Sequence, residues 1–249
     1  MHLVKAENPS INKAKDLLSD FTPDEIRQAI EQKDAIGNSV IHYACAKALV
    51  PWVELLIYNR ADFNVAGEGG QTPIHFAVKG ENKNVSQVKD RVTVVKLLIK
   101  EKVPADKKDY HGRTPLQLAC DVKGQHKVIR ALLSVREIDV NQDVKTGTVT
   151  SSLFHITCQN DQFENAQVLL KHRADPLAKD SLRGDTPFHI ILRKGQVKFA
   201  LRFLKICKEN RDVVREILLA QNAYQQSVLH EAVKCGDKEL VSYCLEYEY

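Results

Sequence analysis

The 249-residue chain lacks the features that mark a membrane or secreted protein. It has no run of about 18 or more apolar residues, which excludes a membrane-spanning helix. Its first residues, MHLVKAENPS, contain no apolar segment of the kind that a secretory signal requires. The six cysteines form no CxxC pair, so we expect free thiols in a reducing compartment. The sequence therefore predicts a cytoplasmic or nuclear protein with no direct insertion into a membrane.

Signatures of catalysis are missing as well. No P-loop, GxSxG, HExxH, GxGxxG or kinase motif occurs, so we expect no enzyme activity, no catalytic residue, no small-molecule substrate and no cofactor. The net charge of +4 is too small by itself to indicate a nucleic-acid partner. Met1 is the only methionine, and the chain stops abruptly at Tyr249. We therefore expect this sequence to be a piece of a longer protein.

What the chain does contain is one eight-residue pattern, present in six versions. Each version has a hydroxyl residue, a small or apolar residue, an apolar residue and usually a histidine. The versions are QTPIHFAV at 71–78, RTPLQLAC at 113–120, DTPFHIIL at 185–192, NSVIHYAC at 38–45, SSLFHITC at 151–158 and QSVLHEAV at 226–233. Successive copies of the histidine position are 33, 42, 38, 34 and 41 residues apart. A repeat of this length is typical of a solenoid.

A second apolar pattern with helical spacing follows each octet, as in WVELLI at 52–57 and VVKLLI at 94–99. A polar stretch with Gly and Asp then precedes the next octet, as in KDYHG at 108–112. This order of turn, Thr-Pro-Leu-His, short helix and longer helix resembles the ankyrin repeat over residues 34–249. The resemblance implies an all-α solenoid of stacked helix-turn-helix units with β-turn or hairpin fingers.

The resemblance divides the chain into a terminal segment and six repeats. Residues 1–33 lack the octet, but Thr22, Pro23 and Glu25 form the start signal of a helix over about 23–32. We expect this segment to be a helical cap of the stack or a degenerate repeat. The repeats are expected at about 34–66, 67–108, 109–146, 147–179, 180–221 and 222–249. Three insertions stand out, namely 80–91, 141–152 and 206–224. We expect a loop or helix extension in the first, a finger in the second and partly helical structure in the third.

The recurring histidine raises the question of a metal site. Two ligands of one zinc ion lie within about 4 Å of each other, whereas packed helices are separated by about 8–10 Å. Equivalent histidines of neighbouring repeats are therefore too far apart to share an ion, and no metal site is predicted. In the family this histidine bonds its turn to the neighbouring one, a structural role that the amide of Gln117 can also fill.

The resemblance also implies where a partner protein or peptide binds. Ankyrin partners usually contact the turn tips and the outward ends of the first helices, on the concave face. Carried onto this sequence, the predicted partner-binding residues are Tyr110, His111, Arg113, Asp121, Gln159, Asn160, Arg183, Asp185, Arg193, Lys194, Tyr224 and Lys234. Tyr and Arg are among the residue types that most often carry interface energy, so Tyr110, Arg113, Arg183, Arg193 and Tyr224 are the candidate hot spots.

Several cations in this set predict a preference for an acidic or phosphorylated segment. The favoured function is a non-catalytic protein-interaction scaffold. Two alternatives remain open: a regulator that resembles the NF-kappa-B inhibitors, or the cytosolic ankyrin domain of a channel or of another multidomain protein. The basic balance of this chain argues against the first alternative, because those inhibitors are markedly acidic.

Overall fold

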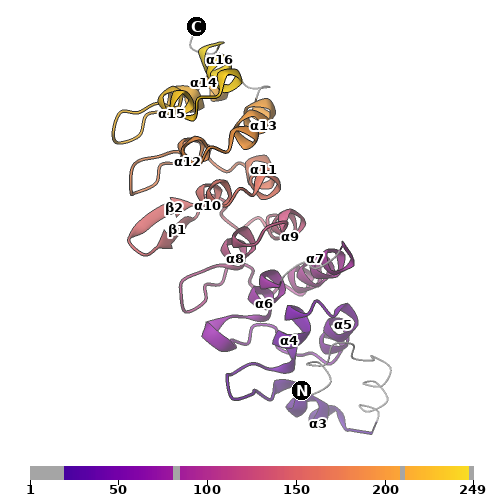
Figure 1. Cartoon of the computed structure of the whole chain (residues 1–249). Coiled ribbons are helices and arrows are strands. Elements are labelled where there is room, and N and C mark those ends of the chain that lie inside the picture. Colours follow the sequence, from indigo (N-terminus) through magenta and orange to yellow (C-terminus); the bar gives the residue numbers. More distant parts are fainter. Residues whose placement is uncertain (1–19, 81–84, 208–210, 247–249) are drawn as a thin grey trace. The chain divides into compact units, whose positions relative to one another are not determined.

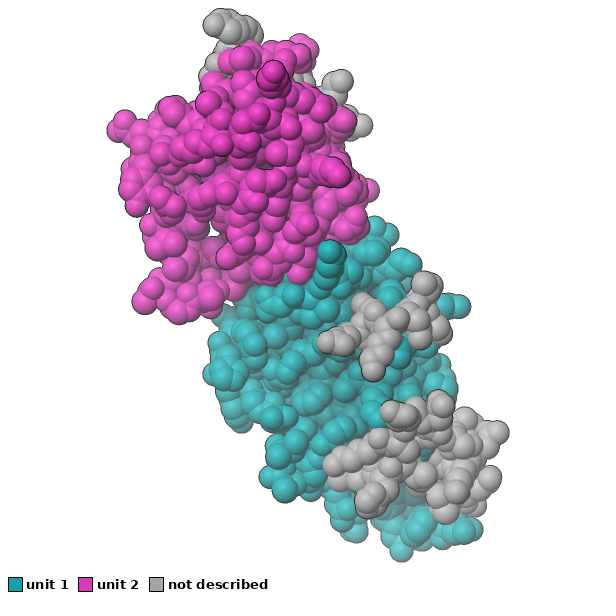
Figure 2. Space-filling view, viewed as in Figure 1, with its two compact units in different colours: residues 1–138 teal, residues 139–249 magenta. Residues whose placement is uncertain are grey.

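The computed structural model describes residues 20–80, 85–207 and 211–246. The chain forms two compact units, residues 1–138 and residues 139–249 (Figure 2). Each unit consists of helix pairs joined by extended turns. Within each unit, the helices that start at the octets form one layer, and the helices that follow them form a second layer (Figure 1).

The described part of the first unit, residues 20–80 and 85–138, begins with a single helix and continues with three helix pairs. The single helix is α3 (Pro23–Glu31), and a short 3-10 turn, η1 (Glu68–Gly70), precedes the second pair. The pairs are α4 (Val40–Ala46) with α5 (Val50–Tyr58), α6 (Pro73–Lys79) with α7 (Val85–Lys100), and α8 (Pro115–Asp121) with α9 (His126–Leu132).

The second unit begins with a two-stranded antiparallel hairpin, β1 (Asp143–Thr146) and β2 (Val149–Ser152), in which Asp143 pairs with Ser152 and Thr146 with Val149. The helices that follow are α10 (Leu153–Gln159), α11 (Phe163–Lys171), α12 (Pro187–Arg193), α13 (Val197–Cys207), α14 (Arg211–Leu219), α15 (Val228–Cys235) and α16 (Lys238–Glu246). The predicted all-α stack of helix-turn-helix units is thus confirmed within each unit, and the second unit contains a hairpin finger.

The octets start helices because they satisfy the backbone groups that a helix end leaves open. Thr114 is the N-cap of α8, where its hydroxyl accepts from the Gln117 N–H at 3.3 Å and its own N–H donates to Gln117 Oε1 at 2.9 Å. Ser152 and His155 form the same reciprocal pair at the start of α10. Pro115 follows the cap, at a position where the missing N–H costs nothing. Each octet therefore encodes the beginning of a first helix.

The core lies between the two helix layers, and the octet supplies one side of it. Its apolar fourth residue is at most 1% exposed in the first five copies: Ile41, Ile74, Leu116, Phe154 and Phe188. Its last residue is fully buried in the same five copies: Cys45, Val78, Cys120, Cys158 and Leu192. Trp52, in the second helix α5, is also buried. In the sixth copy the last residue, Val233, is 59% exposed.

Outside the octets, the terminal segment and the three insertions contain further helices and a hairpin. Helix α3 starts at Pro23 with the Thr22–Glu25 capping box in place and ends one residue earlier than expected. In the first insertion residues 81–84 lie outside the described residues, and α7 begins at Val85, so the remainder is a helix extension. The second insertion forms the β1–β2 hairpin, and the third contains α14, so both are confirmed.

Buried Arg91 fixes the extended start of α7 to the preceding helix. Its Nη1 donates to the carbonyl of Ala77 near the end of α6, where an arginine also meets the negative end of the helix dipole. A Cβ at Gly80 would lie only 2.1 Å from the Arg91 guanidinium, so a larger residue there would force the Arg91 side chain to shift. The Gln125 amide donates to the Val78 and Gly80 carbonyls at 3.2 and 3.1 Å. It thereby provides a hydrogen-bond donor to carbonyls at the end of α6.

Candidate partner-binding face

The turn tips are held by carboxylate and amide side chains that accept from the backbone of their own turn. Asp109 Oδ1 accepts from the N–H groups of His111 and Arg113, both at 2.9 Å. Asp180 and Asn222 do the same in two later turns. Such local bonds replace backbone partners that a turn lacks. Residues at these tips are therefore displayed on fixed backbone.

Four of the five octet histidines, His42, His75, His155 and His189, connect one turn to the next. His155 Nδ1 accepts from the Ser152 N–H at 3.1 Å, which places the ring proton on Nε2, and Nε2 donates to the Asp185 carbonyl at 2.9 Å. The same arrangement joins His42 to Val65, His75 to Arg113 and His189 to Gln226. The structural role implied for the histidines is thus confirmed. Burial lowers the pKa of all four rings.

In the first unit the predicted face is centred on Tyr110. Its side chain is 81% exposed, and its ring lies against Gly70, where an added Cβ would come within 2.3 Å of it. Its backbone N–H donates to the Gly69 carbonyl at 2.9 Å, which joins two neighbouring turns. His111 beside it is also exposed. Tyr110 is therefore an exposed aromatic ring on a fixed support.

Arg113 lies next to Tyr110 but is already paired. Its guanidinium contacts Asp109 Oδ2 at 3.0 Å, and Gln71 donates to the same oxygen at 3.0 Å. Burial alone would raise the pKa of the Asp109 carboxyl, but the bonds from Arg113 and Gln71 outweigh it and lower the pKa to about 2. The charge of Arg113 therefore serves mainly to balance a buried carboxylate.

In the second unit two neighbouring turns place Arg183 over the ring of Tyr224, with 5.1 Å between the guanidinium carbon and the ring centroid. The Ala223 N–H donates to the Arg183 carbonyl at 2.8 Å and fixes the two turns to each other. Tyr224 is 60% exposed. Leu182, which is 66% exposed, stands beside Arg183 on the same turn and is a surface residue that the sequence reasoning missed. Its only sequence signal is a large apolar residue within a polar turn.

Asp185 was expected on the exposed face, and the structure corrects this expectation. Its side chain is fully buried, and in this position it accepts from Asn222 at 2.8 Å and pairs with the Arg193 guanidinium. Burial by itself would raise the pKa of Asp185, but these two partners hold it below its ordinary value. Arg193 therefore resembles Arg113 in balancing an internal carboxylate.

The remaining predicted residues lie at the ends of first helices. Lys234 pairs with buried Glu231 at 3.0 Å, and Lys194 Nζ donates to the Gln159 carbonyl at 3.1 Å. Asp121, Gln159 and Asn160 have exposed side chains. The structure thus brings Tyr110, His111, Arg113 and Asp121 together in the first unit. The others belong to the second unit.

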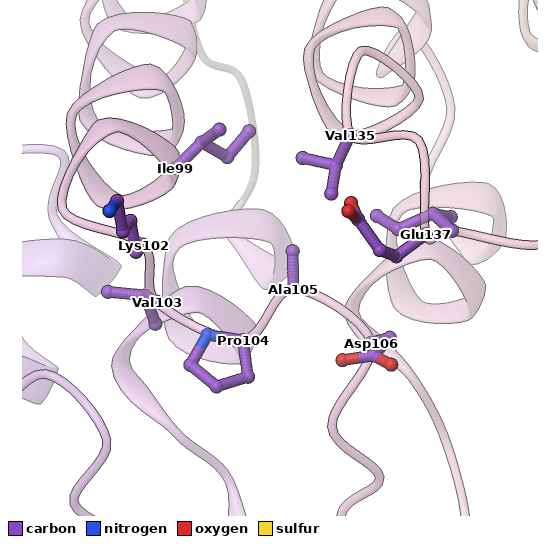
Figure 3. Close-up of a pocket in the computed structure, with 9 residues that line it drawn as sticks. Ile99, Lys102, Val103, Pro104, Ala105, Asp106, Val135 and Glu137 are labelled. Carbon is purple, nitrogen blue, oxygen red and sulfur yellow. The ribbon is translucent and has the colours of Figure 1, made fainter.

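In the first unit a cleft of about 380 Å³ separates the segments that follow α7 and α9. Ile99 and Val135 extend towards each other across it, and the charged side chains of Lys102 and Glu137 lie at its rim (Figure 3).

Within the described residues no group of three His, Cys, Asp or Glu side chains is placed to hold a metal ion. In the same part of the chain, no helix has both the length and the apolar character needed to cross a bilayer.

The geometry and the sequence together define the class of the protein. The model of the family described as ankyrin repeats (3 copies) matches residues 41–144 and 154–249, so the chain belongs to the ankyrin-repeat family. Ankyrin repeats generally mediate protein–protein interactions and are generally non-catalytic.

Three relatives show how widely this kind of segment is used. The chain is 25% identical to human transient receptor potential cation channel subfamily A member 1 over 88% of its own length and 19% of that protein. It is 28% identical to neurogenic locus notch homolog protein 1 of Xenopus laevis over 64% of its length and 6% of that protein. It is 26% identical to the ANK repeat-containing protein nipk-1 of Caenorhabditis elegans, over 77% of its length. The chain spans a third or less of each relative.

Proposed function

We propose that this chain is a non-catalytic scaffold that binds a partner protein or peptide through its turn tips and first-helix ends. The observation that carries the proposal is the display of exposed aromatic side chains on fixed turns. Tyr110 lies on Gly70 in the first unit, and Tyr224 lies under Arg183 in the second. Large exposed rings that lose little entropy on binding are typical of interface anchors.

The proposed partner has apolar or aromatic groups for the two tyrosines, with acidic or phosphorylated groups as secondary contacts. Arg113, Arg193 and Lys234 already balance internal carboxylates. The cations with no carboxylate of their own on this face are Arg183 and Lys194. We therefore place the acidic preference on these two residues, both in the second unit, and expect it to weaken with salt.

A second candidate is the ankyrin segment of a larger protein such as a channel. It is supported by the similarity to the human channel subunit, which extends over 88% of this chain. In that setting the same face would bind another part of the assembly. A cytoplasmic location belongs to this proposal as well.

The test uses variants that leave the internal pairs intact. A partner is captured from a cell extract, identified, purified and titrated calorimetrically against three proteins. Tyr110→Ala/Arg183→Ala/Tyr224→Ala is expected to lose at least about tenfold in affinity, since hot-spot truncations cost about 2 kcal/mol or more. Tyr58→Ala removes an equally exposed ring from a second helix and is expected to bind as the wild type does. Equal binding by the triple variant would place recognition elsewhere, for example on the hairpin.

A further inference from the structure

The second helices of the first unit carry a row of cations that the partner-binding face does not use. On α7 these are Lys89, Lys96 and Lys100, all exposed. Their spacing of seven and four residues puts them on one side of the helix, opposite the buried Val94, Val95 and Leu98. At about 1.5 Å per residue, the row is about 16 Å long.

The neighbouring helix adds further exposed cations. Helix α9 packs against α7 (Figure 1). Lys127 and Arg130 are exposed on α9 and lie opposite its buried Val128, Ile129 and Leu132. Lys123, also exposed, comes just before this helix. We call these six residues, Lys89, Lys96, Lys100, Lys123, Lys127 and Arg130, the basic stripe.

The basic stripe differs from the turn face in having no carboxylate partners. Among the described residues none of its six cations takes part in an ion pair, whereas Arg113, Arg193 and Lys234 each do. Helix α9 has no acidic residue, and the single one in α7, Asp90, is half-buried and already has a partner. Residues 85–138 contain 12 Lys and Arg against 6 Asp and Glu, a net charge of +6 in a chain whose total is +4.

The second unit does not repeat this arrangement. Its second helices α11 and α13 carry Lys171, Lys198 and Lys205, but Glu164 lies among them and pairs with Arg202 at 3.5 Å. The cations there are therefore interrupted by an acid. The local excess of positive charge belongs to the first unit.

We propose that the basic stripe docks the first unit onto an anionic lipid surface. Five of its six residues are lysines, and lysine is depleted at protein interfaces, where aromatic residues and arginine supply the anchors. It contains no aromatic residue, which single-stranded nucleic acids would use for stacking. A cluster of four to eight Lys and Arg suits the dense, rearranging charges of acidic headgroups, and the stripe offers six on two packed helices and the turn between α8 and α9. The contact is peripheral and electrostatic, without insertion into the bilayer.

The proposal is independent of the partner-binding face, because the stripe lies on second helices and the face on turns and first helices. A lipid-bound first unit could still present Tyr110 to a protein. Loss of one activity therefore leaves the other to be measured, and the two proposals fail separately.

The experiment is co-sedimentation of the full chain with vesicles. Neutral phosphatidylcholine vesicles are compared with vesicles that contain about one third phosphatidylserine, at about 0.1 M and about 0.5 M salt. The wild type is expected to bind the anionic vesicles only, and only at the lower salt. The Lys96→Glu/Lys100→Glu/Lys127→Glu variant is expected to lose at least about tenfold in partitioning, given the contribution of each lysine near a charged surface.

The matched control is Lys171→Glu/Lys198→Glu/Lys205→Glu, which changes the net charge equally on second helices of the other unit. It is expected to retain partitioning within about twofold, with circular dichroism showing that both variants fold. An equal loss of vesicle binding in the control would show that binding depends on net charge alone, and would overturn the proposal that the basic stripe is the docking surface. Absence of wild-type binding to anionic vesicles would overturn lipid docking, and binding to polyglutamate instead would assign the stripe to an acidic polypeptide.

Discussion

Asp185 is a carboxylate that the fold buries completely, at a position where the sequence suggested an exposed contact. The charge is tolerated because Arg193 and Asn222 approach it from two different elements. Burying an ion without partners costs several kcal/mol, whereas a paired and hydrogen-bonded ion is nearly neutral for stability. Arg193 is therefore a structural residue with a partly exposed side chain.

Replacing Arg193 with methionine should destabilise the protein by about 1–3 kcal/mol, since Asp185 would keep its charge and lose one partner. Urea unfolding followed by circular dichroism measures the effect. The neighbouring Lys194→Met is the control and should change the free energy of unfolding by less than about 0.5 kcal/mol. If both variants have the same free energy of unfolding, the Arg193–Asp185 ion pair does not contribute to stability. The double variant Asp185→Asn/Arg193→Met should recover part of the loss, because it also removes the buried charge.

The octet histidines make stability depend on pH. Burial lowers the pKa of His42, His75, His155 and His189 in the folded state. Below the ordinary histidine pKa the unfolded chain therefore binds more protons, so their contribution is fully present above about pH 6.5 and is lost as pH falls. A proton on Nδ1 would also face the Thr or Ser N–H that now donates to it.

We therefore expect a lower urea midpoint at about pH 5.5 than at about pH 7.5. His75→Gln/His155→Gln should show a smaller decrease over this interval, since Gln117 already fills the same position without titrating in the pH range of histidine. Asp109, whose pKa is about 2, does not contribute to this window. An unchanged pH dependence in the double variant would mean that other groups cause it.

At the scale of the element, the first helices depend on their N-caps. They are seven or eight residues long, which is too short for stability from helix propensity alone. The cap hydroxyl and the N3 side chain satisfy two backbone groups, and the tertiary contacts supply the rest.

Thr114→Ala should therefore cost about 1 kcal/mol of stability, because the Gln117 N–H loses its acceptor. Thr93→Ala, inside α7, is the comparison. That hydroxyl donates only to the Lys89 carbonyl of its own helix, and alanine is the better helix former, so the change should be neutral or slightly stabilising. Chemical denaturation of both variants decides the matter, and equal costs would show that the hydroxyl of Thr114 does not act as a cap.

At the scale of the whole molecule, one octet position has different environments along the array. The last octet residue is fully buried in Val78 and 59% exposed in Val233. In a repeat protein each repeat is buried against its neighbours, so the same residue type contributes differently to stability in different repeats.

Val78→Ala should accordingly destabilise by about 2 kcal/mol, through lost burial and the cavity that remains. Val233→Ala should change stability by less than about 0.5 kcal/mol. Thermal or urea unfolding distinguishes them. A large loss from Val233→Ala would show that its side chain is covered in solution.

The sequence predicted what depends on local pattern. Period, capping residues and apolar spacing were enough to place the first helices, and the resemblance to ankyrin repeats implied the structural role of the histidines. The pairs Arg113–Asp109, Arg193–Asp185 and Lys234–Glu231 escaped prediction, because a charge near a turn looks exposed until the fold shows what lies beneath it. One available signal was the recurrence of complementary polar residues at the first octet position and eight residues later, as in Gln71 with Lys79 and Asp185 with Arg193.

Three buried cysteines can report the local opening of the repeats in which they lie. Cys45, Cys120 and Cys158 lie at the last octet position of three different repeats, and burial raises the pKa of each thiol. A thiol-specific reagent needs an exposed thiolate, so each of these sites reacts only when its own repeat opens. Labelling followed by mass spectrometry would therefore time the opening of individual repeats in the unmodified chain, from cysteines that the fold already provides.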